Sequence, residues 1–186
     1  MNANDPADHK ILLVSTSLRS GSHSRILAGA ACRALESAGH PVEMLDLRET
    51  PLPLCDGGAA YRDPNVTRLR AQIEAVDAVL LALPIYNYDV SAAAKNLIEL
   101  TGDGWENKVV GFLCAAGGSS SYMSVMSFAN SLMLDFRCVI VPRFVYATGD
   151  AFADGELSDR EILSRVGDLA ITAARLGAGV KAQLAA

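Results

Sequence analysis

The sequence has little cysteine, and none of it is arranged as a metal site. Its four cysteines, Cys32, Cys55, Cys114 and Cys138, form no C-x-x-C pair and no cluster with the three histidines. Structural zinc sites and iron–sulfur clusters need such spacing, so the sequence indicates neither of them. We expect no metal centre and four thiols buried as small hydrophobic groups.

Basic runs and long apolar runs are also missing. The chain has 16 Lys and Arg against 21 Asp and Glu, a formal charge of −5, and its cations are scattered. Neutralising many phosphates needs clustered cations, so nucleic acid is not an expected partner. The apolar run at residues 11–14 is too short for a signal-peptide core or a membrane span. We therefore expect a cytoplasmic protein that does not bind membranes.

The length of 186 residues predicts one domain with its own core. A hydrophobic fraction of 51% and a charged fraction of 20% are typical of globular proteins. No linker and no internal repeat divides the chain. Residues 1–9 are polar and are expected to form a flexible tail, which leaves residues 10–186 as the domain.

Apolar runs alternate with helical periodicities along the chain. Residues 11–14 predict a buried strand, and residues 22–38 predict a helix because apolar positions recur every three or four residues. Further strands are expected near 42–47, 78–83, 109–115 and 138–141, with helices near 63–75, 91–100, 121–134 and from 158 onward. The last helix is expected to open with a capping box of Ser158 and Glu161. Five β–α units predict an α/β fold with a doubly wound, five-stranded parallel sheet.

Ligands of such sheets bind beyond the carboxyl ends of the strands. The first loop there, residues 15–24, holds five serines, one threonine, one arginine and one glycine. Hydroxyls, a guanidinium and the free amides of a helix start are donors that hold a phosphate monoester. The loop matches neither G-x-G-x-x-G nor the P-loop, which disfavours a dinucleotide-binding Rossmann site and an NTPase. The alternative is a serine-rich turn that only caps the helix.

The second loop follows the third predicted strand and contains Pro84, Ile85, Tyr86 and Asn87. An aromatic or apolar wall with nearby backbone amides suits a flat ring. The alternative is that Tyr86 and the following Tyr88 are core residues at the end of the sheet.

The third loop, residues 115–121, follows the fourth predicted strand and contains Ala116, Gly117 and Gly118. Adjacent glycines let backbone pass close to a planar ligand, although a plain β-to-α turn also explains them. The three loops end neighbouring strands, so one ligand is able to touch all three.

The first loop, Ser17-Leu18-Arg19-x-x-Ser22, resembles the S-L-R-x-x-S-x-N-x-x-L loop of the NADPH-dependent FMN reductase family. The second loop resembles the family's P-x-Y-N segment, and Lys95-Asn96 resembles its downstream L-K-N helix. Thr16 and Ser24 replace a glycine and an asparagine of the family pattern, and both keep a hydroxyl donor. Ile85 stands where the family often has glutamate. Ser121-Tyr122 replaces the second glycine pair of the family's third loop.

The resemblance implies a flavodoxin-like fold with strand order 2-1-3-4-5 and FMN as its cofactor. It places the FMN phosphate on the side chains of the first loop and the backbone at His23, and the flavin ring between the second and third loops. Backbone amides of residues 116–118 are expected to stabilise negative charge on the reduced ring. The predicted cofactor-binding residues are Ser17, Arg19, Ser22, His23, Ser24, Pro84, Ile85, Tyr86, Asn87, Ala116, Gly117 and Gly118.

In this interpretation NADPH or NADH passes hydride to FMN, and a small acceptor then takes the electrons: a quinone, a metal ion, an azo compound or free flavin. No catalytic side chain is expected, because the cofactor carries the chemistry. The sequence leaves open a flavodoxin-type electron carrier without turnover of its own. It also leaves open a non-flavin α/β protein that binds another phosphate or acts as a regulatory scaffold.

The helix predicted at 121–134 carries more large apolar groups than one buried stripe needs, among them Tyr122, Met123, Met126 and Met133. Exposed methionine and aromatic surface suits a subunit contact. The resemblance likewise implies dimers or tetramers, so we expect a homodimer or a homotetramer.

Overall fold

A mostly parallel sheet runs through the centre of the computed structural model, which describes residues 10–184. The predicted tail at residues 1–9 lies outside the described residues. A separate two-stranded hairpin of β8 and β9 precedes the last helix. The strands are β1 (Ile11–Ser15), β2 (Val42–Asp46), β3 (Ala78–Tyr86), β4 (Asp89–Val90), β5 (Val109–Ala115), β6 (Val139–Ile140), β7 (Val145–Ala147), β8 (Phe152–Ala153) and β9 (Glu156–Leu157).

The strand order of the main sheet is β2-β1-β3-β5-β6, and all of these neighbours pair in parallel. In the order of the five predicted strands this is 2-1-3-4-5, so the predicted fold class and strand order are confirmed. β7 also pairs in parallel with β5, and the short β4 turns back to pair with β3 in antiparallel. Every residue of β1 and β5 is buried, as expected for strands covered on both faces.

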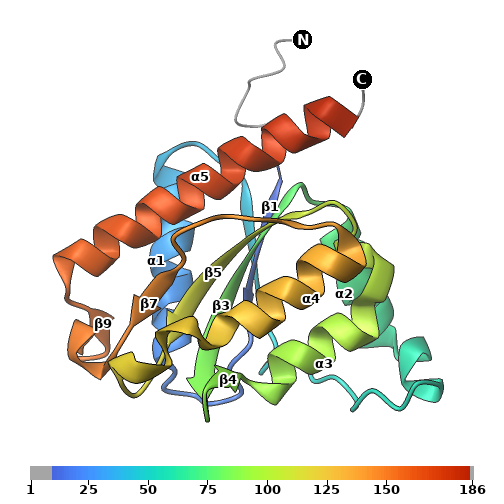
Figure 1. The fold of residues 1–186 in the computed structure, drawn as a ribbon, viewed down its shortest axis with the longest axis horizontal. Helices are drawn as coiled ribbons and strands as arrows, with labels where there is room; N and C mark the ends of the chain where they lie inside the picture. The colour runs from blue at the N-terminus through green and yellow to red at the C-terminus, as the bar shows by residue number, and fades with distance from the viewer. Residues whose placement is uncertain (1–9, 185–186) are drawn as a thin grey trace.

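Helices cover both faces of the sheet, and Figure 1 shows α1 on one side of the strands and α2 and α3 on the other. The apolar cluster on one face includes Leu13 and Leu80 and is closed by α1 and α5. The cluster on the other face includes Leu12 and Phe112 and is closed by α2, α3 and α4. The α-helices are α1 (His23–Ser37), α2 (Pro64–Glu74), α3 (Ala92–Thr101), α4 (Met126–Phe136) and α5 (Arg160–Leu184). Shorter 3₁₀ turns are η2 (Ala59–Arg62), η3 (Gly102–Trp105), η4 (Ser119–Val125) and η5 (Gly149–Ala151).

The capping box predicted for the last helix is wrong. Helix α5 begins at Arg160, and Asp159 Oδ1 accepts the backbone N–H groups of Glu161 and Ile162 at 2.8 and 3.0 Å. The Ser158 hydroxyl instead donates to the carbonyl of Ala151 at 3.1 Å. Aspartate is as good a cap as serine, and Ser158 is used to hold the segment before the helix.

The predicted fifth strand at 138–141 continues further than the sequence indicated. It is divided into β6 and β7, and the break contains Pro142, which has no N–H for a sheet hydrogen bond, and Arg143 with φ of 61°. The helix expected at 121–134 begins with the 3₁₀ turn η4, and the α-helical part starts only at Met126. These shifts place β7 beside β5 at the carboxyl edge of the sheet.

The prediction that all four thiols are buried holds for two of them. Cys114 and Cys138 are buried, whereas Cys32 and Cys55 are partly exposed, and all four are free. Within residues 10–184, every helix is too short or too polar to span a lipid bilayer.

Candidate functional site

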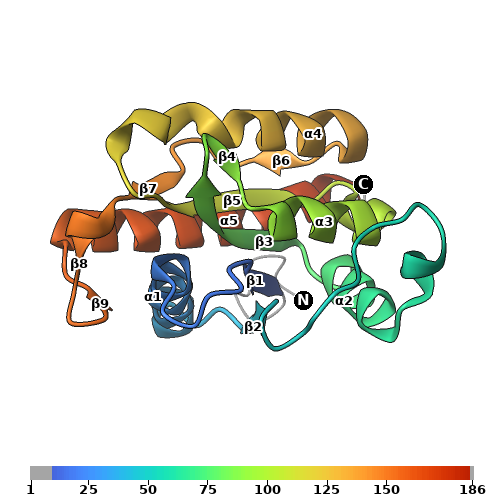
Figure 2. The ribbon, with the colours of Figure 1, turned by 90° about the horizontal axis from the view of Figure 1, so that it is seen from below.

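A cleft of about 560 Å³ opens at the carboxyl edge of the sheet, the edge that Figure 2 views from below. It lies where β1, β3, β5 and β7 end, so segments far apart in the sequence meet there. Every predicted cofactor-binding residue except Gly118 lines it. The lining residues are Ser17, Arg19, Ser22, His23, Ser24, Pro84, Ile85, Tyr86, Asn87, Ala115, Ala116, Gly117 and Gly149.

Three buried serines of the first loop line the cleft: Ser17, and Ser22 and Ser24 at the start of α1. The hydroxyls of Ser22 and Ser24 lie 2.7 Å apart, and Ser17 Oγ accepts the Arg19 backbone N–H at 3.3 Å. The Thr16 hydroxyl, by contrast, donates to the Ala82 carbonyl at 3.0 Å and binds the loop to β3. Of the two hydroxyl residues that depart from the family pattern, only Ser24 therefore faces the cleft.

The first turn of α1 presents backbone amides without a side-chain cap. Ser22 occupies the N-cap position, but its side chain makes no capping hydrogen bond, and the first turn holds no acidic residue. Such a helix start carries partial positive charge and free N–H donors. It is an anion-binding end directed at the cleft that Ser22, His23 and Ser24 line.

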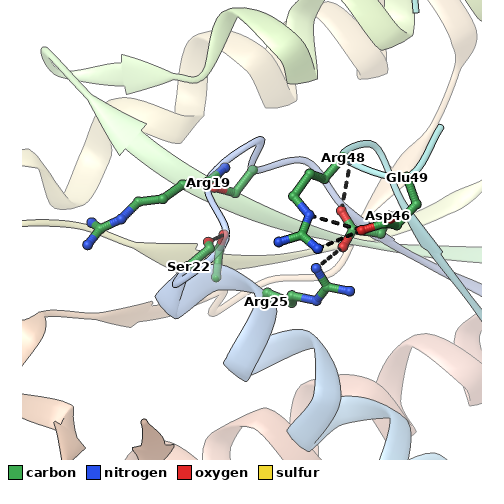
Figure 3. A network of polar contacts seen from close by, with 8 residues as sticks. Arg19, Ser22, Arg25, Asp46, Arg48 and Glu49 are labelled. Carbon is green, nitrogen blue, oxygen red and sulfur yellow. Dashed lines mark hydrogen bonds and ion pairs between the residues drawn. The ribbon is translucent and has the colours of Figure 1, made fainter. Parts of the chain in front are cut away.

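A separate charge network lies on the other side of the first loop. Arg25 pairs with Asp46 at the end of β2, and the Arg48 backbone N–H donates to the same carboxylate at 3.0 Å. Figure 3 shows Arg19 pointing away from this group. Arg19 forms no ion pair with any other described residue, so its guanidinium is available to a ligand, while the Asp46 charge is already neutralised by Arg25.

The second loop is a tight hairpin. β3 runs to Tyr86, and Asn87 and Tyr88 adopt φ of 50° and 62° before β4 pairs back, with Ile85 opposite Val90. Positive φ at both central residues is the geometry of a type I′ hairpin turn. Pro84 and Ile85 are buried, whereas Tyr86 is 53% and Tyr88 66% exposed. The alternative that these two tyrosines are core residues is therefore wrong.

The third loop leaves open space beside its glycines. A Cβ atom built on Gly117 or Gly118 meets no other heavy atom within 4 Å, so neither glycine is required by protein packing. Gly118 is fully extended, with φ of −165°. Ala116 lines the cleft, but its N–H donates to the Ala147 carbonyl at 2.9 Å, so this amide is already bonded within the protein.

Two features of the site involve residues that were not among the predicted cofactor-binding residues. Gly149 lines the cleft, and the His23 ring stacks on Phe152 of β8 with centroids 4.1 Å apart and an interplanar angle of 9°. Both come from the segment after β7, whose position beside β5 was not predicted. Among the described residues there is no group of three or more His, Cys, Asp or Glu side chains that could hold a metal ion.

The donor set fits FMN in kind. Buried hydroxyls, uncapped helix amides and an unpaired guanidinium are the groups that a phosphate monoester needs, and the open glycine backbone leaves room for a flat ring. Pro84 and Ile85 add apolar surface to the lining of the cleft.

Comparison with known proteins agrees with this geometry. The model of the NADPH-dependent FMN reductase family matches residues 9–153. An NAD(P)H-dependent FAD/FMN reductase of Geobacillus thermodenitrificans is 28% identical over 133 residues, 69% of this chain and 71% of the relative. An NAD(P)H:quinone oxidoreductase of Solanum tuberosum is 28% identical over 170 residues, 84% and 87% of the two chains.

Among solved structures, a flavoenzyme NAD(P)H:(acceptor) oxidoreductase of Paracoccus denitrificans superposes with a TM-score of 0.73 at 21% identity. The match covers 90% of this chain and 96% of that one, which shows the shared fold. Because the family model spans most of the sequence, the chain belongs to the NADPH-dependent FMN reductase family, a family of NAD(P)H-dependent flavin oxidoreductases.

Proposed function

We propose that this chain binds FMN in the cleft at the carboxyl edge of the sheet and uses NADPH or NADH to reduce a small acceptor. The observation that carries the proposal is the meeting, in one cleft, of the hydroxyl- and arginine-bearing first loop with the open glycine backbone of the third loop. One end of the cleft suits a phosphate, and the other suits a planar ring.

At the phosphate end, Ser17, Ser22 and Ser24 supply hydroxyls and the first turn of α1 supplies amides. Arg19 adds a charge-assisted contact, which is about twice as strong as a neutral hydrogen bond. The Arg25–Asp46 pair keeps the nearby carboxylate from repelling the phosphate.

At the ring end, Pro84 and Ile85 form the apolar wall, and the Gly117 backbone permits close approach. When bound, FMN supplies the hydride and electron chemistry. The chain positions the ring and leaves the mouth of the cleft accessible beside the exposed Tyr86. The accessible mouth supports the proposal that small acceptors such as quinones, azo compounds, metal ions or free flavin reach the ring.

We further propose a homodimer or homotetramer in the cytoplasm. Large apolar side chains of η4 and α4 are exposed, including Met123 at 60% and Leu134 at 77%, and they form a candidate subunit contact. Four free thiols suit a reducing compartment. Light scattering after size exclusion tests the assembly, and a monomer at micromolar concentration contradicts it.

The cofactor is tested first by the absorbance spectrum of the purified protein, before and after addition of FMN. Arg19→Ala is expected to weaken FMN binding by about 1.5–3 kcal/mol, roughly 10- to 150-fold in Kd, because it removes a charge-assisted contact. Arg33→Ala changes an exposed arginine of α1 that lies outside the lining of the cleft; it is the matched control and is expected to bind FMN normally. Equal affinity of both variants would remove Arg19 from the site.

Turnover is tested by mixing the FMN-loaded protein anaerobically with NADPH and, separately, with NADH. Rapid bleaching of the flavin band supports a reductase, and the faster nucleotide identifies the preferred donor. Absence of bleaching with both nucleotides favours an electron carrier instead.

A further inference from the structure

The third loop of the cleft is held by a tyrosine hydroxyl from the neighbouring strand. Tyr146 of β7 places its oxygen 2.6 Å from the Gly118 carbonyl oxygen and 2.6 Å from Ser121 Oγ. A carbonyl only accepts, so the Tyr146 proton goes to Gly118 and the Ser121 hydroxyl donates to the Tyr146 oxygen. The Ser124 hydroxyl in turn donates to the Ser121 carbonyl at 2.7 Å. Two consecutive hydrogen bonds therefore join the Ser121 hydroxyl of η4 through Tyr146 to the Gly118 carbonyl, and Ser124 separately bonds the Ser121 backbone.

Aromatic packing fixes the position of that hydroxyl. The Tyr122 ring stacks on Phe144 with centroids 4.8 Å apart, and it meets Tyr146 edge-on at 5.4 Å. Tyr146 itself is only 9% exposed. Ser121 and Tyr122 are the two residues that replace the second glycine pair of the family pattern. In this chain, the departure supplies the contacts that anchor the loop.

A second tyrosine holds the same loop from the hairpin. The Tyr88 hydroxyl donates to Ser120 Oγ at 3.0 Å, and the Ser127 hydroxyl lies 3.4 Å from Asp89 Oδ1. Figure 2 shows β4 beside the segment that leads into α4, in agreement with these contacts. The hairpin and the third loop, which form two walls of the cleft, are thus joined by side chains.

Gly117 lies between two fixed points. The Ala116 N–H is bonded to the Ala147 carbonyl on one side, and the Gly118 carbonyl is bonded to Tyr146 on the other. We propose that Tyr146 is a positioning residue for the flavin ring, and that the hydrogen bond from Tyr88 to Ser120 holds the same loop more weakly. This inference rests on the proposed function. Holding the loop in place before binding removes the entropy cost of ordering it around the ring.

The test compares FMN with riboflavin, which has the same ring and no phosphate. Tyr146→Phe is expected to raise the Kd of both ligands by the same factor, about three- to tenfold, the usual range for one hydrogen bond. Arg19→Ala is expected to weaken FMN alone. Tyr88→Phe is expected to have a smaller, equal effect on both ligands, because water competes at its 66% exposed side chain.

Tyr61→Phe is the matched control, because Tyr61 lies in η2, outside the lining of the cleft and away from the third loop. It is expected to leave both affinities unchanged. Circular dichroism and thermal melting confirm that each variant is folded at the titration temperature. If Tyr146→Phe does not fold, Ser121→Ala, which removes the donor to Tyr146, carries the same comparison.

Unchanged binding of both flavins by a folded Tyr146→Phe or Ser121→Ala protein overturns the inference. A loss confined to FMN also overturns it, since that would place the effect at the phosphate. Wild-type protein that binds neither flavin is a different result, because it refutes the proposed function and the inference with it.

Discussion

Replacing Gly117 with valine adds bulk to the cleft without disturbing the surrounding protein. Gly117 is outside the left-handed backbone region, and a Cβ there meets nothing within 4 Å. The free energy of unfolding is therefore expected to change by less than about 0.5 kcal/mol, as for an ordinary surface substitution. A ring lying against this backbone must move away from the new methyl groups. Crowding of this kind costs about 1–3 kcal/mol, so the Kd for FMN is expected to rise roughly 5- to 150-fold.

Two measurements separate these effects. Urea unfolding without flavin gives the stability, and quenching of flavin fluorescence gives the Kd. Gly117→Ala is expected to lie between wild type and Gly117→Val. Gly58→Val is the control, because Gly58 is exposed and lies outside the lining of the cleft. Normal FMN binding by Gly117→Val would show that no ring passes close to the third loop.

Four further substitutions test the packing of the core and of the helix α5. Gly111→Ala is expected to destabilise the fold by about 1–3 kcal/mol in urea unfolding, because its Cβ would lie 2.7 Å from a Leu80 methyl group; unchanged stability would contradict this. Gly179→Ala on α5 is expected to stabilise the fold by about 0.5–1 kcal/mol through helix propensity. Gly177→Ala should lose that gain, because its Cβ would lie 3.1 Å from the Ala78 Cβ of β3. Equal thermal shifts of the two variants would refute this packing. Burial raises the pKa of the Cys138 thiol from 9.0 to about 11, so its contribution to stability is complete below pH 9 and is lost as the pH rises through 11. The stability difference between wild type and Cys138→Ala should therefore fall over that window, and a constant difference would argue against a buried thiol.

The first loop and the sheet order were predictable because their signals are local and continuous. Ser17, Arg19 and Ser22 lie within one short segment between a buried strand and an amphipathic helix, so their meeting needs no long-range contact. Strands buried on both faces give uninterrupted apolar runs, which fixed the positions of β1, β3 and β5.

The remaining parts of the site depend on contacts between distant segments. The hairpin turn at Asn87 and Tyr88 contains no glycine that would predict its positive φ angles. The Tyr88 hydroxyl bonds to Ser120, which is 32 residues away in the sequence. Gly149 enters the cleft because the chain resumes pairing with β5 after Pro142. A short sequence motif does not show which hydroxyls or amides already form hydrogen bonds within the protein. The Thr16 hydroxyl, for example, is bonded to the Ala82 carbonyl and is not directed at the cleft.

The broken fifth strand bears on the behaviour of the protein at high concentration. Long sheet edges with unpaired amides invite strand addition by other chains and, finally, aggregation. Within residues 10–184, the edge formed by β6 and β7 offers only two and three residues, interrupted by Pro142. The opposite edge, β2, has five residues, carries the exposed Glu43 and is preceded by Pro41. In the described part of the chain, neither border of the sheet therefore offers a neighbouring molecule a long strand without charge or interruption.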